Sequence, residues 1–273
     1  MKNILITGCS SGIGLQTAIT LKEHGVKVYA TARKEQDVKI LENMGFIALK
    51  LDVTNSSDIK NAFETILQND KKLDCLFNNA GFGQPGAVED LSIEALKEQF
   101  ETNFFALFEL TKMAMKIFRE QGYGKIIQHS SVLGIISLRF RGAYNASKYA
   151  IEGLCDTLRL ECANSNIFIS TINTGPVTSK FRENALEKFR KNIKIDGSFF
   201  ENIYKNELKN RLESKDDKSL FNLPASSVAN VVLKIVNSKK PKPRYYVTKA
   251  TYILGFAKRV LSQNLLDKLL LKI

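Results

Sequence analysis

A tyrosine and a lysine four residues apart form a pair whose side chains could do chemistry together. Tyr144 and Lys148 stand in GAYNASKYA, residues 142–150, which is predicted to begin a helix. Residues at i and i+4 share one face of a helix, so the ammonium should lie beside the phenol. A neighbouring positive charge favours the phenolate and lowers the tyrosine pKa, which would fit Tyr144 to give and take a proton. The alternative is an ordinary pair on an exposed helix face.

A glycine-rich turn near the start of the chain predicts a dinucleotide site. The sequence TGCSSGIG, residues 7–14, places Gly8, Gly12 and Gly14 between a predicted strand and an amphipathic helix. Glycines there let the backbone approach a pyrophosphate, and the helix N-terminus offers unpaired N–H groups. The spacing is G-x-x-x-G-x-G rather than the common G-x-G-x-x-G, and a plain tight turn is the alternative.

The end of the second predicted strand indicates which dinucleotide would bind. An NAD site needs a carboxylate there for the ribose 2′-hydroxyl, whereas an NADP site needs a cation for the 2′-phosphate. The sequence is ATARK, residues 30–34, and the first acid is Glu35. Arg33 is therefore a candidate phosphate ligand, with help from the hydroxyls of Ser10 and Ser11. We expect NADP(H); an ordinary surface arginine is the alternative.

The pattern of the whole chain predicts how these residues are positioned. Predicted strands cover 2–7, 26–32, 46–53, 73–81, 124–131, 167–175 and 244–247, and predicted helices cover 13–24, 35–44, 56–69, 92–101, 104–121, 144–163 and 225–237. This alternation predicts an α/β, doubly wound Rossmann fold: a central parallel sheet of six to seven strands with helices on both faces. With no linker or repeat, we expect 1–273 to form a single dinucleotide-binding and catalytic domain.

Polar residues and glycines mark the carboxyl ends of the predicted strands. They are Asp52 after the third, Asn78, Asn79, Ala80 and Gly81 after the fourth, Ser130 and Ser131 after the fifth, and Thr174, Gly175 and Pro176 after the sixth. Ligands of open α/β sheets bind beyond the carboxyl ends of the strands. Together these residues predict one cleft.

In the order of its motifs, the sequence resembles the short-chain dehydrogenase/reductase family, in its single-domain branch. The motifs are TGxxxGIG at 7–14, LDVT at 51–54, NNAG at 78–81, Asn103 in TNFFA, Ser131 in HSSVLG, Tyr144-x-x-x-Lys148 and TGPVTS at 174–179, and they span nearly the whole chain. The resemblance implies a catalytic tetrad of Asn103, Ser131, Tyr144 and Lys148. Ser131 is favoured over Ser130 because the family's serine lies 13 residues before its tyrosine.

The resemblance also implies roles for these residues in the reduction of a carbonyl. Tyr144 would protonate the oxygen, Ser131 would stabilise the developing alkoxide, Lys148 would also hold the nicotinamide ribose, and Asn103 would anchor a relay water. The implied NADP(H) contacts are Gly8, Ser10, Ser11, Gly12, Ile13, Gly14, Arg33, Asp52, Val53, Asn79, Ala80, Gly81, Tyr144, Lys148, Pro176, Val177 and Ser179. Thr174 departs from the family's usual proline before the glycine, which would loosen this turn.

The segment 178–222 breaks the alternation and is expected to be a lid over a substrate cleft; a solvated insertion is the alternative. The stretches TGCSSGIGL, TARK and PKPRYYV resemble the branch that contains 17β-hydroxysteroid and retinol dehydrogenases. This implies an apolar alcohol, ketone or aldehyde, such as a steroid, retinoid or fatty aldehyde. Candidate pocket residues are Leu138, Phe140, Phe181, Phe199 and Phe200, unless they fill the core.

The net charge of +12 is concentrated near the C-terminus, where residues 239–273 hold nine Lys or Arg and one acid. A nucleic-acid binder would spread basic and aromatic residues over one face, so we expect no nucleic-acid partner. The basic amphipathic C-terminal segment 249–273 is expected to pack on the domain or on a second subunit of a homo-oligomer. Peripheral contact with an anionic membrane is the alternative.

The remaining features bound the location and leave two other functions open. Four cysteines without a CxxC pair and only two histidines predict no metal site, and the short N-terminal apolar run reads as a strand rather than a secretory signal. We expect a cytoplasmic protein, with membrane association as the alternative. A catalytically silent NADP(H)-binding regulator is disfavoured by the intact Ser-Tyr-Lys set. A nucleotide-sugar-modifying enzyme on the same fold is disfavoured by the lack of a G-x-x-G-x-x-G turn.

Overall fold

A parallel sheet of seven strands forms the centre of the computed structural model, which describes residues 1–208, 210, 213 and 221–273. The strands lie in the order β3-β2-β1-β4-β5-β6-β7, and each neighbouring pair is parallel. Their bounds are β1 Asn3–Ile6, β2 Lys27–Ala32, β3 Ile47–Lys50, β4 Cys75–Asn78, β5 Tyr123–Ser131, β6 Asn166–Thr174 and β7 Arg244–Tyr246. The strand order reverses between β1 and β4, where doubly wound sheets bind their ligands.

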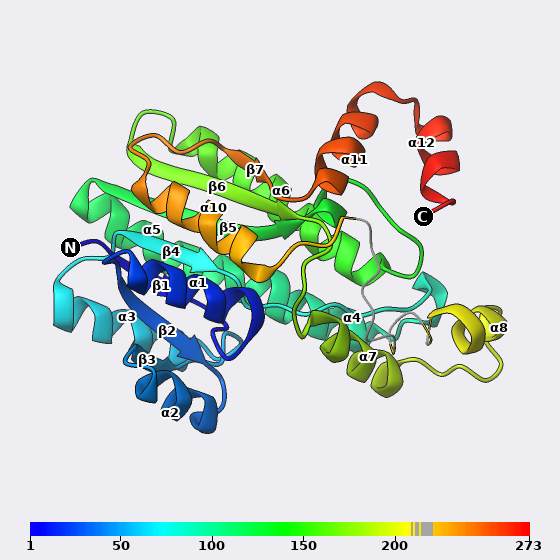
Figure 1. Ribbon diagram of the computed structural model, residues 1–273, viewed down its shortest axis with the longest axis horizontal. Coiled ribbons are helices and arrows are strands. Elements are labelled where there is room, and N and C mark those ends of the chain that lie inside the picture. Colours follow the sequence, from blue (N-terminus) through cyan, green and yellow to red (C-terminus); the bar gives the residue numbers. More distant parts are fainter. Residues whose placement is uncertain (209, 211–212, 214–220) are drawn as a thin grey trace.

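Helices cover both faces of this sheet (Figure 1). On one face lie α1 Gly12–Glu23, α2 Glu35–Asn43 and α10 Ala225–Asn237, and on the other lie α3 Ser56–Asp70, α5 Ala106–Gln121 and α6 Gly142–Glu161. Strands buried on both faces need continuous apolar runs, as in NILI of β1. The predicted fold class is confirmed.

The two helices predicted at 92–101 and 104–121 form one continuous helical path. The helix α4 Ile93–Phe100 passes into α5 through a π-helical turn, η2 Glu101–Phe105. The hydroxyl of Ser92 caps the start of α4 by accepting the amide of Ala95, and Gly122 ends α5 in the left-handed conformation. Single π turns occur frequently at functional sites, and this one carries Asn103.

The segment predicted to be a lid, 178–222, leaves the body after β6 and returns before α10. Its described part contains α7 Phe181–Asn192, α8 Glu201–Ile203 and the π-helical η4 Tyr204–Leu208, whereas residues 209, 211–212 and 214–220 lie outside the described residues. Val177 pairs with Leu223, and the amide of Leu223 donates to the carbonyl of Pro176 at 3.2 Å. Both ends of the segment are therefore tied together at the carboxyl end of β6.

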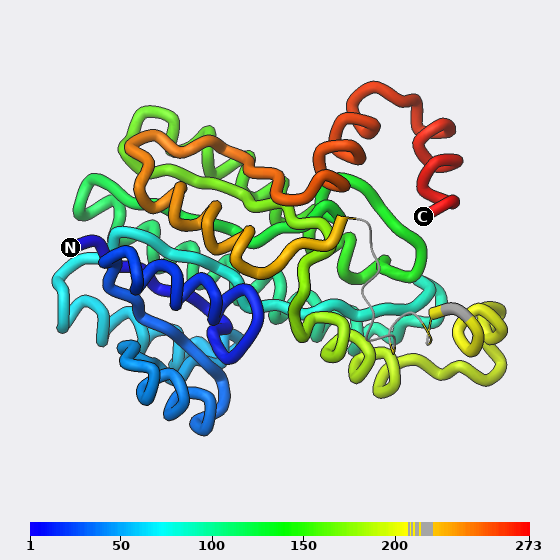
Figure 2. Tube along the Cα trace, viewed as in Figure 1, coloured from blue at the N-terminus to red at the C-terminus, as the bar shows by residue number. Residues whose placement is uncertain are grey.

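The chain ends in two helices that follow β7, namely α11 Lys249–Val260 and α12 Gln263–Leu270. Figures 1 and 2 show them standing off from the sheet, at the same end of the molecule as α7 and α8. Leu254 and Leu270 attach them to the body by packing against a cluster of Val132, Leu133 and Ile136. Among the helices described, none is long and apolar enough to cross a bilayer.

Candidate active site

The glycine-rich turn connects β1 to α1 with a backbone that strongly favours glycine. Gly8 and Gly12 have φ angles of +72° and +58°, and a Cβ at Gly14 would lie 2.1 Å from the carbonyl oxygen of Gly8. Ser11 is the N-cap of α1, but its side chain makes no capping hydrogen bond, and Ile13 packs into the core below. Among the described residues, no side chain accepts the amides of Gly12, Ile13 or Gly14. This arrangement fits the pyrophosphate of a dinucleotide.

The end of β2 lies against this turn. The amide of Cys9 donates to the carbonyl of Thr31 at 2.7 Å, which brings the turn up to the strand end. Ser10, which follows Cys9, and Arg33, two residues after Thr31, are both exposed. The nearest acid in sequence, Glu35, forms an ion pair with Lys50 at 3.1 Å. This edge therefore presents a hydroxyl and a cation, the groups that suit a 2′-phosphate.

The end of β4 holds the glycine turn in shape from the other side. The hydroxyl of Thr7 accepts the amides of Asn79 and Ala80, each at 2.9 Å. The side-chain amide of Asn79 donates to the carbonyls of Thr7 and Gly8 at 2.9 and 3.2 Å. Because these bonds cross from β4 to β1, they fix the reversal point of the sheet.

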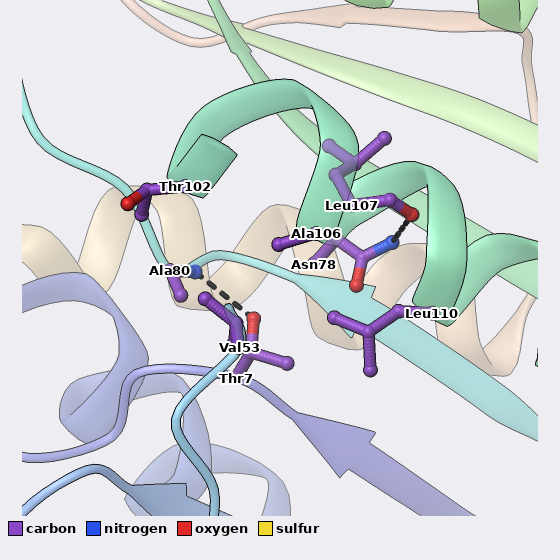
Figure 3. A pocket seen from close by; sticks show the side chains of 8 residues that line it. All are labelled: Thr7, Val53, Asn78, Ala80, Thr102, Ala106, Leu107 and Leu110. Carbon is purple, nitrogen blue, oxygen red and sulfur yellow. Dashed lines mark hydrogen bonds between the residues drawn. The ribbon is translucent and has the colours of Figure 1, made fainter. Parts of the chain in front are cut away.

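A pocket beside these bonds collects further strand-end residues (Figure 3). Its lining residues are Thr7, Val53, Asn78, Ala80, Thr102, Ala106, Leu107 and Leu110. The pocket brings two predicted cofactor residues, Val53 and Ala80, to one place, next to Asp52, whose side chain accepts the amide and hydroxyl of Thr54 at 3.0 and 2.8 Å. No sequence motif pointed to Thr102, which reaches this pocket from the π turn.

Tyr144 and Ser131 meet at the carboxyl end of β5. Ser131 is the last residue of β5, Tyr144 lies in the first turn of α6, and the Ser131 hydroxyl is near enough to the phenol to lower its pKa. Ser131 Oγ also accepts the amide of Leu133 at 3.1 Å, at the start of a short 3-10 helix, η3 Val132–Gly134. Ser130 is turned inward and its hydroxyl accepts the side chain of Asn173 at 3.4 Å. Of the two serines, Ser131 is the one that influences the pKa of Tyr144.

We expected Lys148 to lower the pKa of Tyr144, but in the structure that pKa is raised. Burial raises the pKa of Tyr144 to about 12, while the nearby hydroxyl of Ser131 and the charge of Arg141 oppose that rise. Lys148 Nζ lies 5.5 Å from the centroid of the phenol ring and donates to the carbonyl of His129 at 2.6 Å. Burial lowers the pKa of Lys148 itself to about 8. The expectation of a lowered Tyr144 pKa was wrong, because burial outweighs the nearby charges.

Asn103 ties the end of β4 to the first turns of α6. Its side chain is 1% exposed; Oδ1 accepts the amide of Phe82 at 3.1 Å, and Nδ2 donates to the carbonyl of Phe82 at 2.9 Å and to Ser147 Oγ at 3.3 Å. Ser147 in turn donates to the carbonyl of Tyr144 at 2.8 Å. A Cβ at Gly81 would lie 3.0 Å from Asn103 Oδ1, so glycine leaves room for this contact. The water-anchoring role of Asn103 stays a prediction.

His129 is a site residue that sequence reasoning missed. Its Nδ1 lies 3.0 Å from Asn79 Oδ1 and its Nε2 lies 3.2 Å from Thr174 Oγ1. Since the amide nitrogen of Asn79 already donates to two carbonyls, we assign the ring proton to Nδ1, and Nε2 then accepts from Thr174. Burial and the charge of Lys148 lower the pKa of His129 to about 3. The expected loosening at Thr174 is therefore offset by a hydrogen bond that proline could not make.

The start of the predicted lid crosses from the glycine turn to Tyr144, following Pro176 and Val177. A Cβ at Gly12 would lie 3.2 Å from the Cβ of Ser179. Two residues further on, the ring of Phe181 packs edge-on against the ring of Tyr144, with centroids 5.4 Å apart. A Cβ at Gly83 would lie 2.7 Å from Phe181, so this ring is wedged over the end of β4 as well. Of the predicted cofactor residues, Ser179 thus lies over the turn.

The five candidate pocket residues do not form one pocket. Phe181 contacts Tyr144, whereas Leu138 and Phe140 line a cavity of about 520 Å³ beside the start of α6. The ring of Phe140 packs on that of Phe200, with centroids 5.3 Å apart, inside a second cluster formed by the lid. Phe199 is 87% exposed. Within the described residues, no group of three or more His, Cys, Asp or Glu side chains is placed to hold a metal ion.

Comparison with known proteins identifies the family. Residues 2–189 match the model of the family described as short chain dehydrogenase. The chain is 36% identical over 270 residues to the uncharacterized oxidoreductase YbbO of Escherichia coli K12, covering 98% of this chain and 94% of that protein. It therefore belongs to the short-chain dehydrogenase family of oxidoreductases, as the motifs predicted.

Two further relatives carry more specific names. Bovine retinol dehydrogenase 8 is 32% identical over 262 residues, which cover 89% of this chain and 80% of that protein. The NADPH-dependent 3-dehydrocapnine reductase of Ornithobacterium rhinotracheale is 29% identical over 282 residues, which cover 100% of this chain and 97% of that one.

Proposed function

We propose that this chain is an NADP(H)-dependent oxidoreductase that interconverts an apolar ketone or aldehyde with the corresponding alcohol. The observation that carries this proposal is that the hydroxyls of Tyr144 and Ser131 interact at the same edge of the sheet as the glycine turn. A phenol whose pKa is raised to about 12 is protonated at neutral pH. That is the state that carbonyl reduction requires of its general acid.

Each side chain of the site has its own role in the reduction. Tyr144 gives its proton to the carbonyl oxygen as negative charge develops there, and Ser131 donates a hydrogen bond to the same oxygen. Bound NADPH supplies the hydride, which no side chain of the site could provide. Lys148 holds the nicotinamide ribose and keeps positive charge below the phenol ring. In alcohol oxidation Tyr144 takes the proton back.

The preference for NADP(H) rests on the end of β2. Arg33 would bind the 2′-phosphate with the help of Ser10, and the pyrophosphate would lie on the first-turn amides of α1, from Gly12 onward. A carboxylate that would favour NAD is lacking at this strand end, since Glu35 is paired with Lys50. The name of the Ornithobacterium rhinotracheale relative, an NADPH-dependent reductase, supports the same choice.

The apolar character of the substrate rests on the surroundings of Tyr144. The ring of Phe181 covers its ring, and Leu138 packs against the same apolar cluster. A retinoid alcohol is the substrate that the name of the bovine relative gives, and it would suit such surroundings. The insertion 178–222 would act as the lid of this single domain, because its paired ends form a narrow base beside the site.

The experiment that tests this proposal is a cofactor and substrate screen. Oxidation of NADPH would be followed at 340 nm with steroids, retinoids, fatty aldehydes and small ketones, and each active pair would be repeated with NADH. We expect turnover with at least one apolar carbonyl and a clear preference for NADPH. Turnover with NADH at equal efficiency would overturn the cofactor assignment. Tight NADPH binding with no turnover of any carbonyl would favour a silent cofactor-binding protein.

A further inference from the structure

We propose that α11 and α12 form a docking surface for an anionic lipid membrane and hold the cavity beside the start of α6 close to it. The delivery of an apolar substrate from that membrane rests on the function proposed above, but the docking itself does not.

Large apolar side chains are unusually exposed on these two helices. Those more than half exposed are Tyr252, Ile253, Phe256, Val260, Leu265, Leu271 and Ile273. On α11, Tyr252, Phe256 and Val260 are spaced at i, i+4 and i+8, so they lie along one face of the helix. Thr251 and Ala257 are buried and face the body instead. Tyr252 also packs against the ring of Tyr246, with centroids 5.3 Å apart. Exposed apolar side chains gathered along one helix face mark an interaction surface.

The charges around this face select an anionic surface as its partner. Lys249, Lys258, Arg259, Lys268 and Lys272 are exposed on or beside these helices, whose one acid is Asp267. The apolar face and the cations together have the composition of a helix pair that lies in a membrane interface. A second copy of the same surface would bring like charges together, which disfavours a symmetric dimer through it. The lysines at 239, 240 and 242 precede β7, so they lie near the amino ends of the parallel strands, away from α11 and α12.

The docking surface and the site pack against the same apolar cluster. Leu254 of α11 and Leu270 of α12 pack against the cluster that follows β5, which Leu138 and Tyr144 also contact. Leu138 lines the cavity of about 520 Å³ beside the start of α6. A membrane on the outer face of α11 and α12 would therefore meet the protein next to the proposed catalytic tyrosine.

The test measures binding of the full chain to vesicles, without substrate or cofactor. Sedimentation with vesicles of equal parts phosphatidylglycerol and phosphatidylcholine would be compared with vesicles of phosphatidylcholine alone, at low and high salt. A variant with Tyr252→Ser, Phe256→Ser and Val260→Ser removes the apolar face. The matched control is Leu160→Ser, because Leu160 is 75% exposed on α6, away from the C-terminal helices. A second variant, Lys258→Gln, Arg259→Gln, Lys268→Gln and Lys272→Gln, removes charge but no apolar surface.

We expect binding to anionic vesicles at low salt, weakened by about tenfold or more in both multiple variants and unchanged in Leu160→Ser. Turnover of a water-soluble carbonyl should stay near that of the unmodified chain in all of them, so a failed docking proposal would not be confused with a failed function. The proposal is overturned if neither vesicle type binds at low salt. It is equally overturned if the serine variant binds as well as the unmodified chain, or if that variant instead dissociates a dimer in solution.

Discussion

The ring of Phe181 packs edge-on against the ring of Tyr144, with centroids 5.4 Å apart and ring planes at 63°. Phe181 is the first residue of α7, so the segment proposed as a lid touches the proposed general acid directly. The contact shields one side of the phenol from water and contributes to the burial that raises its pKa. It also means that a substrate placed beside Tyr144 must lie against Phe181.

Replacing Phe181 by alanine should therefore weaken the binding of apolar substrates. We expect KM for an apolar carbonyl to rise about tenfold, because a partly exposed aromatic contact is lost, with a smaller effect on a small polar carbonyl. Steady-state kinetics on both substrates measures the difference. Phe199→Ala is the matched control, since Phe199 lies in the same segment but is 87% exposed. Equal effects of the two substitutions would remove Phe181 from the substrate site.

Arg33→Ala should reduce the affinity for NADPH and leave that for NADH nearly unchanged. A charge-assisted contact to a phosphate is worth roughly 1.5–3 kcal/mol, which corresponds to an increase of about 10- to 100-fold in Kd for NADPH. Fluorescence titration with both cofactors gives the two Kd values. Lys39→Ala provides the control, because Lys39 is an exposed cation of α2 beyond the strand end. An equal increase in Kd for both cofactors would mean that Arg33 does not bind the 2′-phosphate.

Arg141 should influence the pH dependence of alcohol oxidation. Its positive charge opposes the rise in the pKa of Tyr144, so its removal leaves the phenol a weaker acid. Oxidation needs Tyr144 to accept a proton, and the rate therefore rises as pH approaches this pKa. In Arg141→Met we expect the rise of the oxidation rate with pH to move to higher pH by about half a unit. Arg139→Met, which removes a cation two residues away, should leave the pH profile of the oxidation rate unchanged. A shift in both variants would show that the net charge of the protein, rather than Arg141, sets the profile.

His129 should make the protein less stable in acid. Burial and Lys148 lower its pKa from 6.5 to about 3, so between these values the unfolded chain binds a proton that the folded chain excludes. The free energy of unfolding should accordingly fall by about 1.4 kcal/mol per pH unit as pH drops from 6.5 toward 3 because of this one group. Above pH 6.5 the contribution is constant.

Denaturant unfolding of His129→Asn across this pH range would measure that slope, because asparagine can hydrogen-bond but does not titrate. The difference in free energy between the unmodified chain and the variant should change with pH below 6.5 and stay flat above it. His24→Asn, at the exposed end of α1, controls for the loss of a histidine. A difference that is independent of pH would show that His129 binds a proton as readily in the folded chain as in the unfolded one.

Much of the fold and of the candidate site followed from local sequence signals. Local sequence position was enough to predict the glycine turn, with glycines at 8, 12 and 14. It was also enough to predict that the polar residues after each strand lie at the strand ends. Tyr144 and Lys148 likewise share a helix face through their spacing. These features need no knowledge of which distant side chains meet them.

The parts that could not be predicted depend on contacts between distant segments. His129 bridges Asn79 and Thr174, which lie 50 and 45 residues from it along the chain. The direction of the Tyr144 pKa shift depends on how deeply α6 and the lid bury the phenol, and spacing shows only that a cation is near. The exposure of α11 could not be foreseen from its amphipathic pattern, since the same pattern would serve a helix packed on the body.

The most direct test of the account is the reduction of an active carbonyl by Tyr144→Phe, with NADPH binding measured on the same sample. The phenylalanine keeps the ring contact with Phe181 and removes only the proton donor. Tyr149→Phe is the control, because the hydroxyl of Tyr149 lies on the same helix and donates to the carbonyl of Ile135. The account predicts a loss of about 10³-fold or more in kcat for Tyr144→Phe, intact NADPH affinity, and a nearly normal Tyr149→Phe. A Tyr144→Phe enzyme that binds NADPH and turns over near the normal rate would contradict it.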